Sequence, residues 1–474
     1  MRHETGSPTT PLEAERMNWP ILIAVGTGTF MSALDGSVAN TVLPVLTSAL
    51  HGSIAGAEWV VTVYLLVTSA LLLSAGRWGD LHGHKPMYLA GFVVFILGSA
   101  FCGLATSLPL LIVMRAVQAL GATCLFSSSP AIVTLNFPAK RRGQALGLQA
   151  TLTYLGITAG PLLGGWLTSH LGWRSVFFIN VPVGLLALGL SQRFVPLDRP
   201  RSATAAFDIP GSALFATGLV ALLLALNQGH AWGWVSLPTL GLLGLAAASL
   251  AGFVSWERRT TAPMLDLGLF RDRSFSAAGV SALLNFVCVS GLLFLLPFYL
   301  IEGRALSAAR AGLFISALPL AMAAVAPASG WLSDRIGPAL PTTTGMILLA
   351  AGALLLTRLG PNTGLHTLAW ELALAGTGVG LFLSPNNSAL MGAAPLDRQG
   401  VAAGVRATAR NLGNVLGIGS VGAVFNSVLA RHAPAGALFA AFHAGLWVVA
   451  LAALLGAATS AFRSRVGRAS LPAA

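Results

Sequence analysis

The segment Gly76–Lys85 reads Gly-Arg-Trp-Gly-Asp-Leu-His-Gly-His-Lys, and it returns in altered form late in the chain. The later copy, Gly330–Pro338, reads Gly-Trp-Leu-Ser-Asp-Arg-Ile-Gly-Pro, so that both contain the skeleton Gly-x-x-x-Asp-x-x-Gly. Each copy follows the second of six long apolar stretches and precedes the third. The repeat therefore predicts two equivalent six-helix halves.

The composition indicates a protein embedded in a lipid bilayer. Of its 474 residues 55% are hydrophobic and only 9% are charged, whereas soluble globular chains carry about 25% charged residues. This scarcity of charge excludes a soluble enzyme and a disordered protein. A helix that crosses a bilayer needs about 20 mostly apolar residues. Fourteen stretches meet this need: 19–43, 57–75, 87–106, 108–134, 146–168, 175–192, 209–228, 237–254, 276–301, 309–331, 340–358, 366–391, 402–429 and 438–461.

The distribution of Lys and Arg predicts the orientation, because these residues concentrate in cytoplasmic connections. With a cytoplasmic N-terminus, twenty-one of the 27 bases fall on the cytoplasmic side, Arg406 and Arg410 among them, and Arg115 lies inside a span. The net charge of +12 then reflects topology and anionic lipid, and we expect no nucleic-acid partner. Both termini are predicted to be cytoplasmic. The outer side holds five bases: Arg174, Arg304, Arg310, Arg358 and Arg431.

These features predict an all-α polytopic membrane protein in three parts. Residues 1–192 form an N-terminal six-helix bundle, and residues 193–273 form a linker region with two extra transmembrane helices. Residues 274–474 form a C-terminal six-helix bundle and a cytoplasmic tail. Two similar bundles around a site near the membrane midplane are the architecture of alternating-access transporters.

Several motifs, in order along the chain, make the sequence resemble the major facilitator superfamily, in its fourteen-span drug:proton antiporter branch. Gly76–Lys85 resembles the signature loop Gly-x-Leu-x-Asp-Arg-x-Gly-Arg-Lys, with Leu81 and His84 in place of two arginines. Leu34–Pro44 resembles the branch motif Leu-Asp-x-Thr-Val-Val-Asn-x-Ala-Leu-Pro. Its departures are Ser37 and Ala39.

Three further segments strengthen this resemblance. Arg115-x-x-Gln118 is similar to the motif Arg-x-x-Gln-Gly, and Trp173–Pro182 is similar to a segment of the same branch. The segment Gly156–Gly165 matches the antiporter motif of the family at every fixed position. The resemblance implies a major facilitator fold with 14 transmembrane helices, in which two six-helix bundles flank two inserted helices.

The resemblance also implies roles for two sets of residues. The signature loop and its copy are expected to latch the two halves together in an outward-open state, and the alternative is that their aspartates only form turns. Glycines in the fifth stretch allow close helix packing, and its proline kinks the helix. The gating candidates are Gly76, Asp80, Gly83, Lys85 and Asp334. The antiporter-motif candidates are Gly156, Gly160, Pro161, Gly164 and Gly165.

Asp35 and Arg115 are the charges inside the membrane that matter most. A charge at the bilayer centre costs roughly 2.5–3.5 kcal/mol, so each should face the protein interior or water. The helical rise places them about 14 Å and about 10 Å from the outer membrane edge, so they can meet directly or through Gln118 and water. We interpret them as a proton-coupling pair, with a structural ion pair as the alternative. Glu371, in the twelfth stretch, is a further proton-coupling candidate or a solvated acid.

Aromatic and amide side chains in the first, second, fourth, ninth and twelfth stretches are the candidates for substrate binding. Aromatic rings near a buried carboxylate suit a lipophilic cation through cation–π contacts, whereas most such rings pack against helices or lipid. The substrate-binding candidates are Asn40, Trp59, Tyr64, Gln118, Asn285, Phe286 and Asn386.

The sequence contains no P-loop, no catalytic motif and no His/Cys cluster with metal-ligand spacing. We therefore expect no enzyme activity, no metal and no cofactor, with a proton gradient as the energy source. The predicted function is export of lipophilic or cationic drugs by a monomer in the bacterial inner (plasma) membrane. Export of an endogenous metabolite or antibiotic, an uptake symporter, and a membrane scaffold without transport remain as alternatives.

Overall fold

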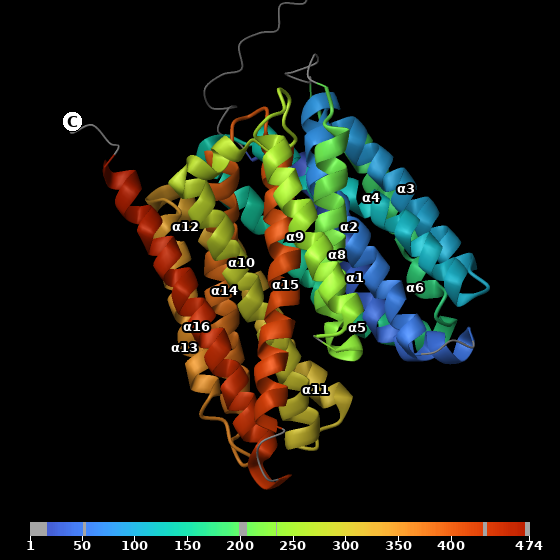
Figure 1. Ribbon diagram of the computed structural model, residues 1–474, viewed down its shortest axis with the longest axis vertical. Coiled ribbons are helices and arrows are strands. Elements are labelled where there is room, and N and C mark those ends of the chain that lie inside the picture. Colours follow the sequence, from blue (N-terminus) through green and yellow to red (C-terminus); the bar gives the residue numbers. More distant parts are fainter. Residues whose placement is uncertain (1–16, 51–53, 199–205, 234, 430–433, 470–474) are drawn as a thin grey trace, which may run out of the picture.

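The computed structural model describes residues 17–50, 54–198, 206–233, 235–429 and 434–469. Over these residues the chain forms long helices that run side by side, and it forms no strand. Figure 1 shows the helices of the first half on one side of the molecule and those of the second half on the other, with α8 and α9 across the front.

The first bundle is formed by seven helices, because the sixth predicted span is broken at Ile179 into a short and a long piece. Within it α1 packs along α5, and α4 packs against both α2 and α3. The bounds are α1 (Trp19–Ala49), α2 (Ile54–His82), α3 (His84–Leu104), α4 (Leu108–Asn136), α5 (Arg142–Leu171), α6 (Ser175–Phe178) and α7 (Asn180–Phe194).

The two extra helices are α8 (Ile209–Trp232) and α9 (Leu237–Glu257), which pack against each other, while α8 also contacts α2. The N-terminus of α8 is capped by Asp208, whose Oδ1 accepts a hydrogen bond from the backbone N–H of Gly211 at 2.9 Å. Such a cap satisfies one of the amide groups that a helix start leaves without a partner.

The second bundle again has seven helices, because the tenth predicted span is broken at Ser316. Its first helix continues into a π-helical segment at Phe298–Gly303. The bounds are α10 (Arg273–Pro297), α11 (Ala308–Ile315), α12 (Ala317–Ile336), α13 (Ala339–Leu356), α14 (Leu365–Ala393), α15 (Gln399–Leu429) and α16 (Pro434–Ala469).

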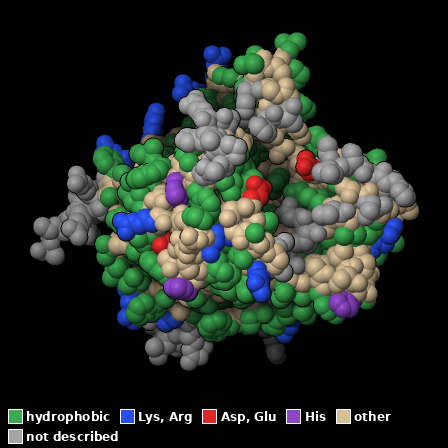
Figure 2. Space-filling view, turned by 90° about the horizontal axis from the view of Figure 1, so that it is seen from below, with side chains coloured by type: hydrophobic (Ala, Val, Ile, Leu, Met, Phe, Trp, Pro, Cys, Tyr) green, Lys and Arg blue, Asp and Glu red, His purple; other side chains and the backbone are tan. Residues whose placement is uncertain are grey.

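The helices have the length and hydropathy of a membrane protein. Among the described residues 13 helical stretches are long and apolar enough to cross a bilayer. The remaining predicted span is α5, a 30-residue helix rich in Gly, Gln and Thr that packs between α1 and α12. Figure 2, the view onto the end near α11, shows a surface on which hydrophobic side chains predominate and acidic ones are few.

The repeated sequence skeleton folds into the same turn in both halves. Gly83 and Gly337 have φ angles of +98° and +83°, which L side chains rarely adopt. The amide of Gly83 donates to the carbonyl of Gly79 at 2.8 Å, and that of Gly337 donates to Ser333 at 2.9 Å. Both turns join the second long helix of a bundle to the third, as the repeat predicts.

Candidate functional site

A buried carboxylate cluster lies inside the first bundle. Asp35 on α1 is only 2% exposed, and its Oδ2 accepts a hydrogen bond from Nη1 of Arg115 at 2.9 Å. Its Oδ1 accepts hydrogen bonds from Nε2 of Gln118 at 3.0 Å and from Nδ2 of Asn180 at 2.8 Å. The predicted meeting of Asp35 and Arg115 is confirmed, both directly and through Gln118. Asn180 was not predicted as a partner of Asp35, although it lies in the segment Trp173–Pro182 that resembles the antiporter branch.

Arg115 connects the Asp35 cluster to α2. Its Nε donates to the carbonyl of Val60 at 3.2 Å, and its guanidinium lies 4.4 Å from the ring centroid of Tyr64. Gln118 also donates to Ser99 Oγ at 2.6 Å. A buried ion pair is stable only when its remaining donors and acceptors are satisfied. The structure thus places Tyr64 and Gln118 in the Asp35 cluster, within the first bundle.

Asp80, in the signature loop, joins the two bundles. Its Oδ1 and Oδ2 accept hydrogen bonds from the backbone amides of Gly400 at 2.7 Å and Val401 at 3.0 Å, in the first turn of α15. His84 Nε2 lies 3.1 Å from Asp80 Oδ1. A Cβ on Gly76 would overlap the carbonyl of Gly400, so glycine allows the two helices to meet here.

Asp334, in the second copy of the skeleton, makes the reciprocal contact. Its two oxygens accept hydrogen bonds from the amides of Gly143 and Gln144, both at 2.8 Å, in the first turn of α5. Gly330 lies against the carbonyl of Gly143 as Gly76 lies against that of Gly400. A carboxylate is favourable at a helix N-terminus, where backbone amides lack partners. Each bundle therefore caps one helix of the other, which is the geometry of a latch.

Two of the gating candidates act within the first bundle. Gly83 supplies the turn described above. Lys85 donates its backbone amide to Asp198 Oδ1 and its Nζ to the carbonyl of Gln192, both at 2.9 Å. Gln192 lies on α7 and Asp198 lies just after its end, so Lys85 holds the loop to α7 and makes neither of these bonds across the latch.

The antiporter motif packs α5 closely against α1. A Cβ on Gly156 would lie 2.6 Å from the carbonyl oxygen of Phe30, and one on Gly160 would lie 2.5 Å from Ser37 Cβ. Ser37 Oγ donates to the carbonyl of Ile157 at 2.8 Å. The helical partner of that carbonyl would be the backbone N–H of residue 161, four positions later. Residue 161 is a proline and has no N–H, so the carbonyl lacks this partner. Ser37, a departure from the family motif, satisfies it.

The other motif positions contribute differently. Gly164 is buried, whereas Gly165 is exposed and a Cβ there would meet nothing within 4 Å. The side chain of Pro161 lies outside the described residues. The close helix contact of the motif therefore depends on Gly156 and Gly160.

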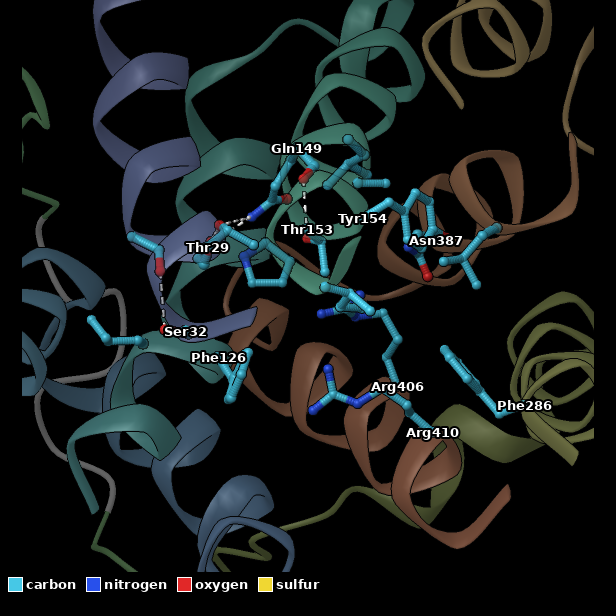
Figure 3. A pocket seen from close by; sticks show the side chains of 18 of the residues that line it. Thr29, Ser32, Phe126, Gln149, Thr153, Tyr154, Phe286, Asn387, Arg406 and Arg410 are labelled. Carbon is cyan, nitrogen blue, oxygen red and sulfur yellow. Dashed lines mark hydrogen bonds between the residues drawn. The ribbon is translucent and has the colours of Figure 1, made fainter. Parts of the chain in front are cut away.

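A central cavity of about 120 Å³ lies between the two bundles. Its walls come from α1, α3, α4 and α5 on one side and from α10, α14 and α15 on the other. Figure 3 shows Thr29, Gln149, Tyr154, Arg406 and Arg410 around it. Gln149 Nε2 donates to Thr29 Oγ1 at 3.3 Å and to Ser129, so polar contacts join three helices of the first bundle at this wall.

Of the predicted substrate residues, Phe286 alone is among the residues that line this cavity in the described structure. Asn285 contacts Met346 Sδ at 3.4 Å, and Asn386 donates to the carbonyl of Ala278 at 2.9 Å, so both amides join helices within the second bundle. A neighbour on a helix is rotated by about 100°, which is why Asn387 reaches the cavity instead.

Two further candidates also lie away from the cavity lining. Trp59 is half-buried on α2, outside the set of cavity residues. The side chain of Asn40 lies outside the described residues. Glu371 is 4% exposed on α14, and its Oε2 has no hydrogen-bond partner among the described residues. Its role remains a prediction.

The predicted position of Arg406 and Arg410 in a cytoplasmic connection is wrong. Both were counted among cytoplasmic bases, yet they line the central cavity on α15, which begins at Gln399. Arg410 is eleven residues into this helix, or about 16 Å along its axis. An arginine pair with a four-residue spacing inside an apolar stretch is the signal that identifies them.

This fold, two bundles latched across a polar cavity with a buried ion pair in one of them, is that of a membrane transporter. The chain belongs to the Major Facilitator Superfamily, whose family model matches residues 25–418.

Its relatives include transporters of several kinds. The chain is 37% identical to the multidrug resistance protein Stp of Mycobacterium tuberculosis over 404 residues, 85% of this chain and 75% of Stp. It is 34% identical to the riboflavin transporter RibZ of Clostridioides difficile, over 88% of this chain and 89% of RibZ. It is 33% identical to the tetracenomycin C resistance and export protein of Streptomyces glaucescens, over 86% of this chain and 76% of that protein.

Proposed function

We propose that this protein is a proton-coupled antiporter that exports drug-like small molecules by alternating access. It acts as a monomer in the bacterial plasma membrane, with both termini in the cytoplasm. The buried Asp35–Arg115 cluster is the observation that carries the proposal, because a costly buried charge pair in a transporter is by default a functional site. The names of Stp and the tetracenomycin exporter support drug export.

Protonation of Asp35 is the coupling step. A neutral carboxyl removes the partner charge of Arg115 and weakens the hydrogen bonds from Gln118 and Asn180. Leaving a buried charge without its partner costs about 3–5 kcal/mol, enough to move the helices that carry these groups. Asp35 lies on α1, one turn after Ser32, which lines the cavity. The same helix therefore senses both the proton and the substrate.

The antiporter motif transmits this movement to the gate. Gly156 packs α5 onto α1, while Gly143 and Gly147 hold the same helix against α12 of the other bundle. Thr151 on α5 also donates to the carbonyl of Ala323 at 3.1 Å. A displacement of α1 therefore also displaces α5 and changes the contact between α5 and α12 of the other bundle. With the loops cytoplasmic, the two latches close the inner gate, which corresponds to an outward-facing state.

The proposal is tested with purified protein in proteoliposomes that contain the pH indicator pyranine. Ethidium, a cation, and fluorescein, an anion, are added in separate experiments; at least one of them should release protons from wild-type vesicles loaded with acid, and Asp35→Asn should abolish this flux. Glu58→Gln, which changes an exposed carboxyl at the start of α2, is the matched control and should retain the flux. If Asp35→Asn shows the same proton flux as the wild type between about pH 6 and about pH 8, Asp35 is not the coupling group.

Export of an antibiotic made by the producing cell is a second candidate, favoured by the similarity to the tetracenomycin C exporter. An uptake symporter is the remaining candidate, and the name of RibZ, a riboflavin transporter, states no direction of transport. The direction of proton flux separates uptake from export, because a symporter moves protons with the substrate and an antiporter moves them against it.

A further inference from the structure

Two arginines face the central cavity from the same side of α15. Arg406 and Arg410 are one helical turn apart, and Figure 3 shows both reaching toward the space between the bundles. The guanidinium of Arg410 lies 4.9 Å from the ring centroid of Phe126, and its Nε donates to Asn411 Oδ1 at 3.3 Å. Nε of Arg406 is buried and has no hydrogen-bond partner within the described structure.

No carboxylate balances this pair at the cavity. In the part of the chain that the structure describes, no Asp or Glu lines the cavity and neither arginine takes part in a salt bridge. The hydroxyl of Tyr154, also at the cavity, is a second buried polar group without a partner. The remaining polar lining groups are neutral: Thr29, Ser32, Tyr88, Ser129, Gln149, Thr153 and Asn387.

Such a charge pair needs a counter-ion or water. Arginine keeps its charge at all physiological pH values, so neither side chain can escape repulsion by losing a proton. A cavity of about 120 Å³ has room for several water molecules, which hydrate the guanidinium groups while no substrate is bound. A substrate that displaces this water must itself satisfy the positive charge.

We infer that the transported molecule is an organic anion whose acidic group binds Arg406 and Arg410. This inference rests on the proposed function, for which it names the substrate class. Guanidinium groups bind carboxylates, sulfonates and phosphates through paired, charge-assisted hydrogen bonds. Phe126, Phe286 and Leu383 supply the apolar wall for the rest of the molecule. Asp35, on which the expectation of a cationic substrate rested, is not among the residues that line the cavity.

Two dyes with the same xanthene skeleton test the inference: fluorescein, which is anionic, and rhodamine 123, which is cationic. Their binding to purified protein is measured by fluorescence anisotropy in a nonionic detergent without added lipid, so that no lipid headgroup supplies the anion. We expect fluorescein to bind wild-type protein at least tenfold more tightly than rhodamine 123. Equal or tighter binding of rhodamine 123, or binding of neither dye, overturns the inference.

Substitutions assign the binding to the pair. Arg406→Gln with Arg410→Gln should weaken fluorescein binding by roughly 10- to 100-fold without weakening that of rhodamine 123. The corresponding double substitution to Lys, which keeps the charge and guards against a folding defect, should weaken fluorescein binding less than the double Gln substitution does, because Lys loses only the paired hydrogen bonds. Arg193→Gln, at an exposed position on α7, is the control and should change nothing. Unchanged fluorescein affinity in the double Gln variant overturns the inference.

The two proposals fail in different experiments. Binding in detergent needs no proton gradient, so fluorescein binding that depends on both arginines supports the anion site even if proteoliposomes show no proton flux. Rhodamine-driven proton flux with no fluorescein binding supports the antiporter and refutes the anion site.

Discussion

The two reciprocal latches predict that Asp80→Asn and Asp334→Asn each favour opening of the two bundles at the end where the loops Gly76–Lys85 and Gly330–Pro338 lie. Asp80 caps α15 and Asp334 caps α5, each through the amides of the second and third residues of the helix. Asparagine keeps one acceptor oxygen, but it replaces the other with an NH2 group that cannot accept a hydrogen bond. One backbone amide then loses its partner, and the negative charge at the helix N-terminus is lost.

The size of the effect follows from these contacts. An unsatisfied buried amide costs about 1–3 kcal/mol, and the lost charge at a helix N-terminus adds about 0.3–1 kcal/mol. Each substitution should therefore shift the equilibrium between the latched and the open state toward the open state by roughly 10- to 1,000-fold. Both latches break in the same opening, so the double variant should shift it by roughly the product of the two single effects, about a hundredfold or more. The two single substitutions should have similar effects, because each removes one carboxylate that accepts two backbone amides of the opposite bundle.

Distances between spin labels on the two bundles measure this opening. Ala90 and Thr344 are exposed and follow the turn glycine of each half by the same number of residues, so labelled cysteines there report on both bundles. We expect a longer distance to gain population in each single variant and to dominate in the double variant. Asp272→Asn is the control, since Asp272 accepts two backbone amides within its own bundle. An unchanged distance distribution in either single variant would refute the reciprocal latch.

Two further substitutions test the helix contacts behind the gate. Gly156→Ala places a methyl group 2.6 Å from the carbonyl oxygen of Phe30 and should lower the stability by about 1–3 kcal/mol, whereas Gly165→Ala, with open space around it, should leave the thermal midpoint unchanged. Equal midpoints for the two variants would contradict the packing role. Asn180→Leu removes one donor from Asp35 and should cost about 1.5–3 kcal/mol, seen as a lower thermal midpoint together with slower proton flux; a variant that matches wild type in both would exclude Asn180 from the cluster.

The site residues that could be predicted from sequence either cost free energy inside a membrane or belong to a motif that occurs twice. Asp35 and Arg115 are identifiable because a membrane span tolerates few charges, and their depths along two antiparallel helices agree. Asp80 and Asp334 are identifiable because the same skeleton occurs twice. Their partners on the opposite bundle were not predictable, since a sequence does not state which helix ends meet across an interface.

The residues that were misplaced are those whose position depends on helix rotation. The spans are apolar around most of their circumference, so no hydrophobic stripe indicates which side faces the cavity. Asn386 and Asn387 differ by one position, yet one joins two helices and the other lines the cavity. Arg406 and Arg410 lie near the start of the predicted span 402–429, so a count of loop charges assigns them to the cytoplasmic connection before it.

Separate sites for the proton and the anion have an energetic consequence. A membrane potential of about 100 mV contributes about 2.3 kcal/mol per charge, and one pH unit contributes about 1.4 kcal/mol. Exchange of one proton for a neutral molecule moves one charge and supports a gradient of roughly 500-fold, whereas exchange for a monovalent anion moves two charges and supports roughly 20,000-fold. A monovalent cation moves no net charge, so only the pH term remains. Collapsing the potential with valinomycin and potassium should therefore reduce fluorescein accumulation far more than it reduces that of a neutral compound. A gradient that is insensitive to the potential would be incompatible with an anion bound by Arg406 and Arg410 and exchanged for a proton.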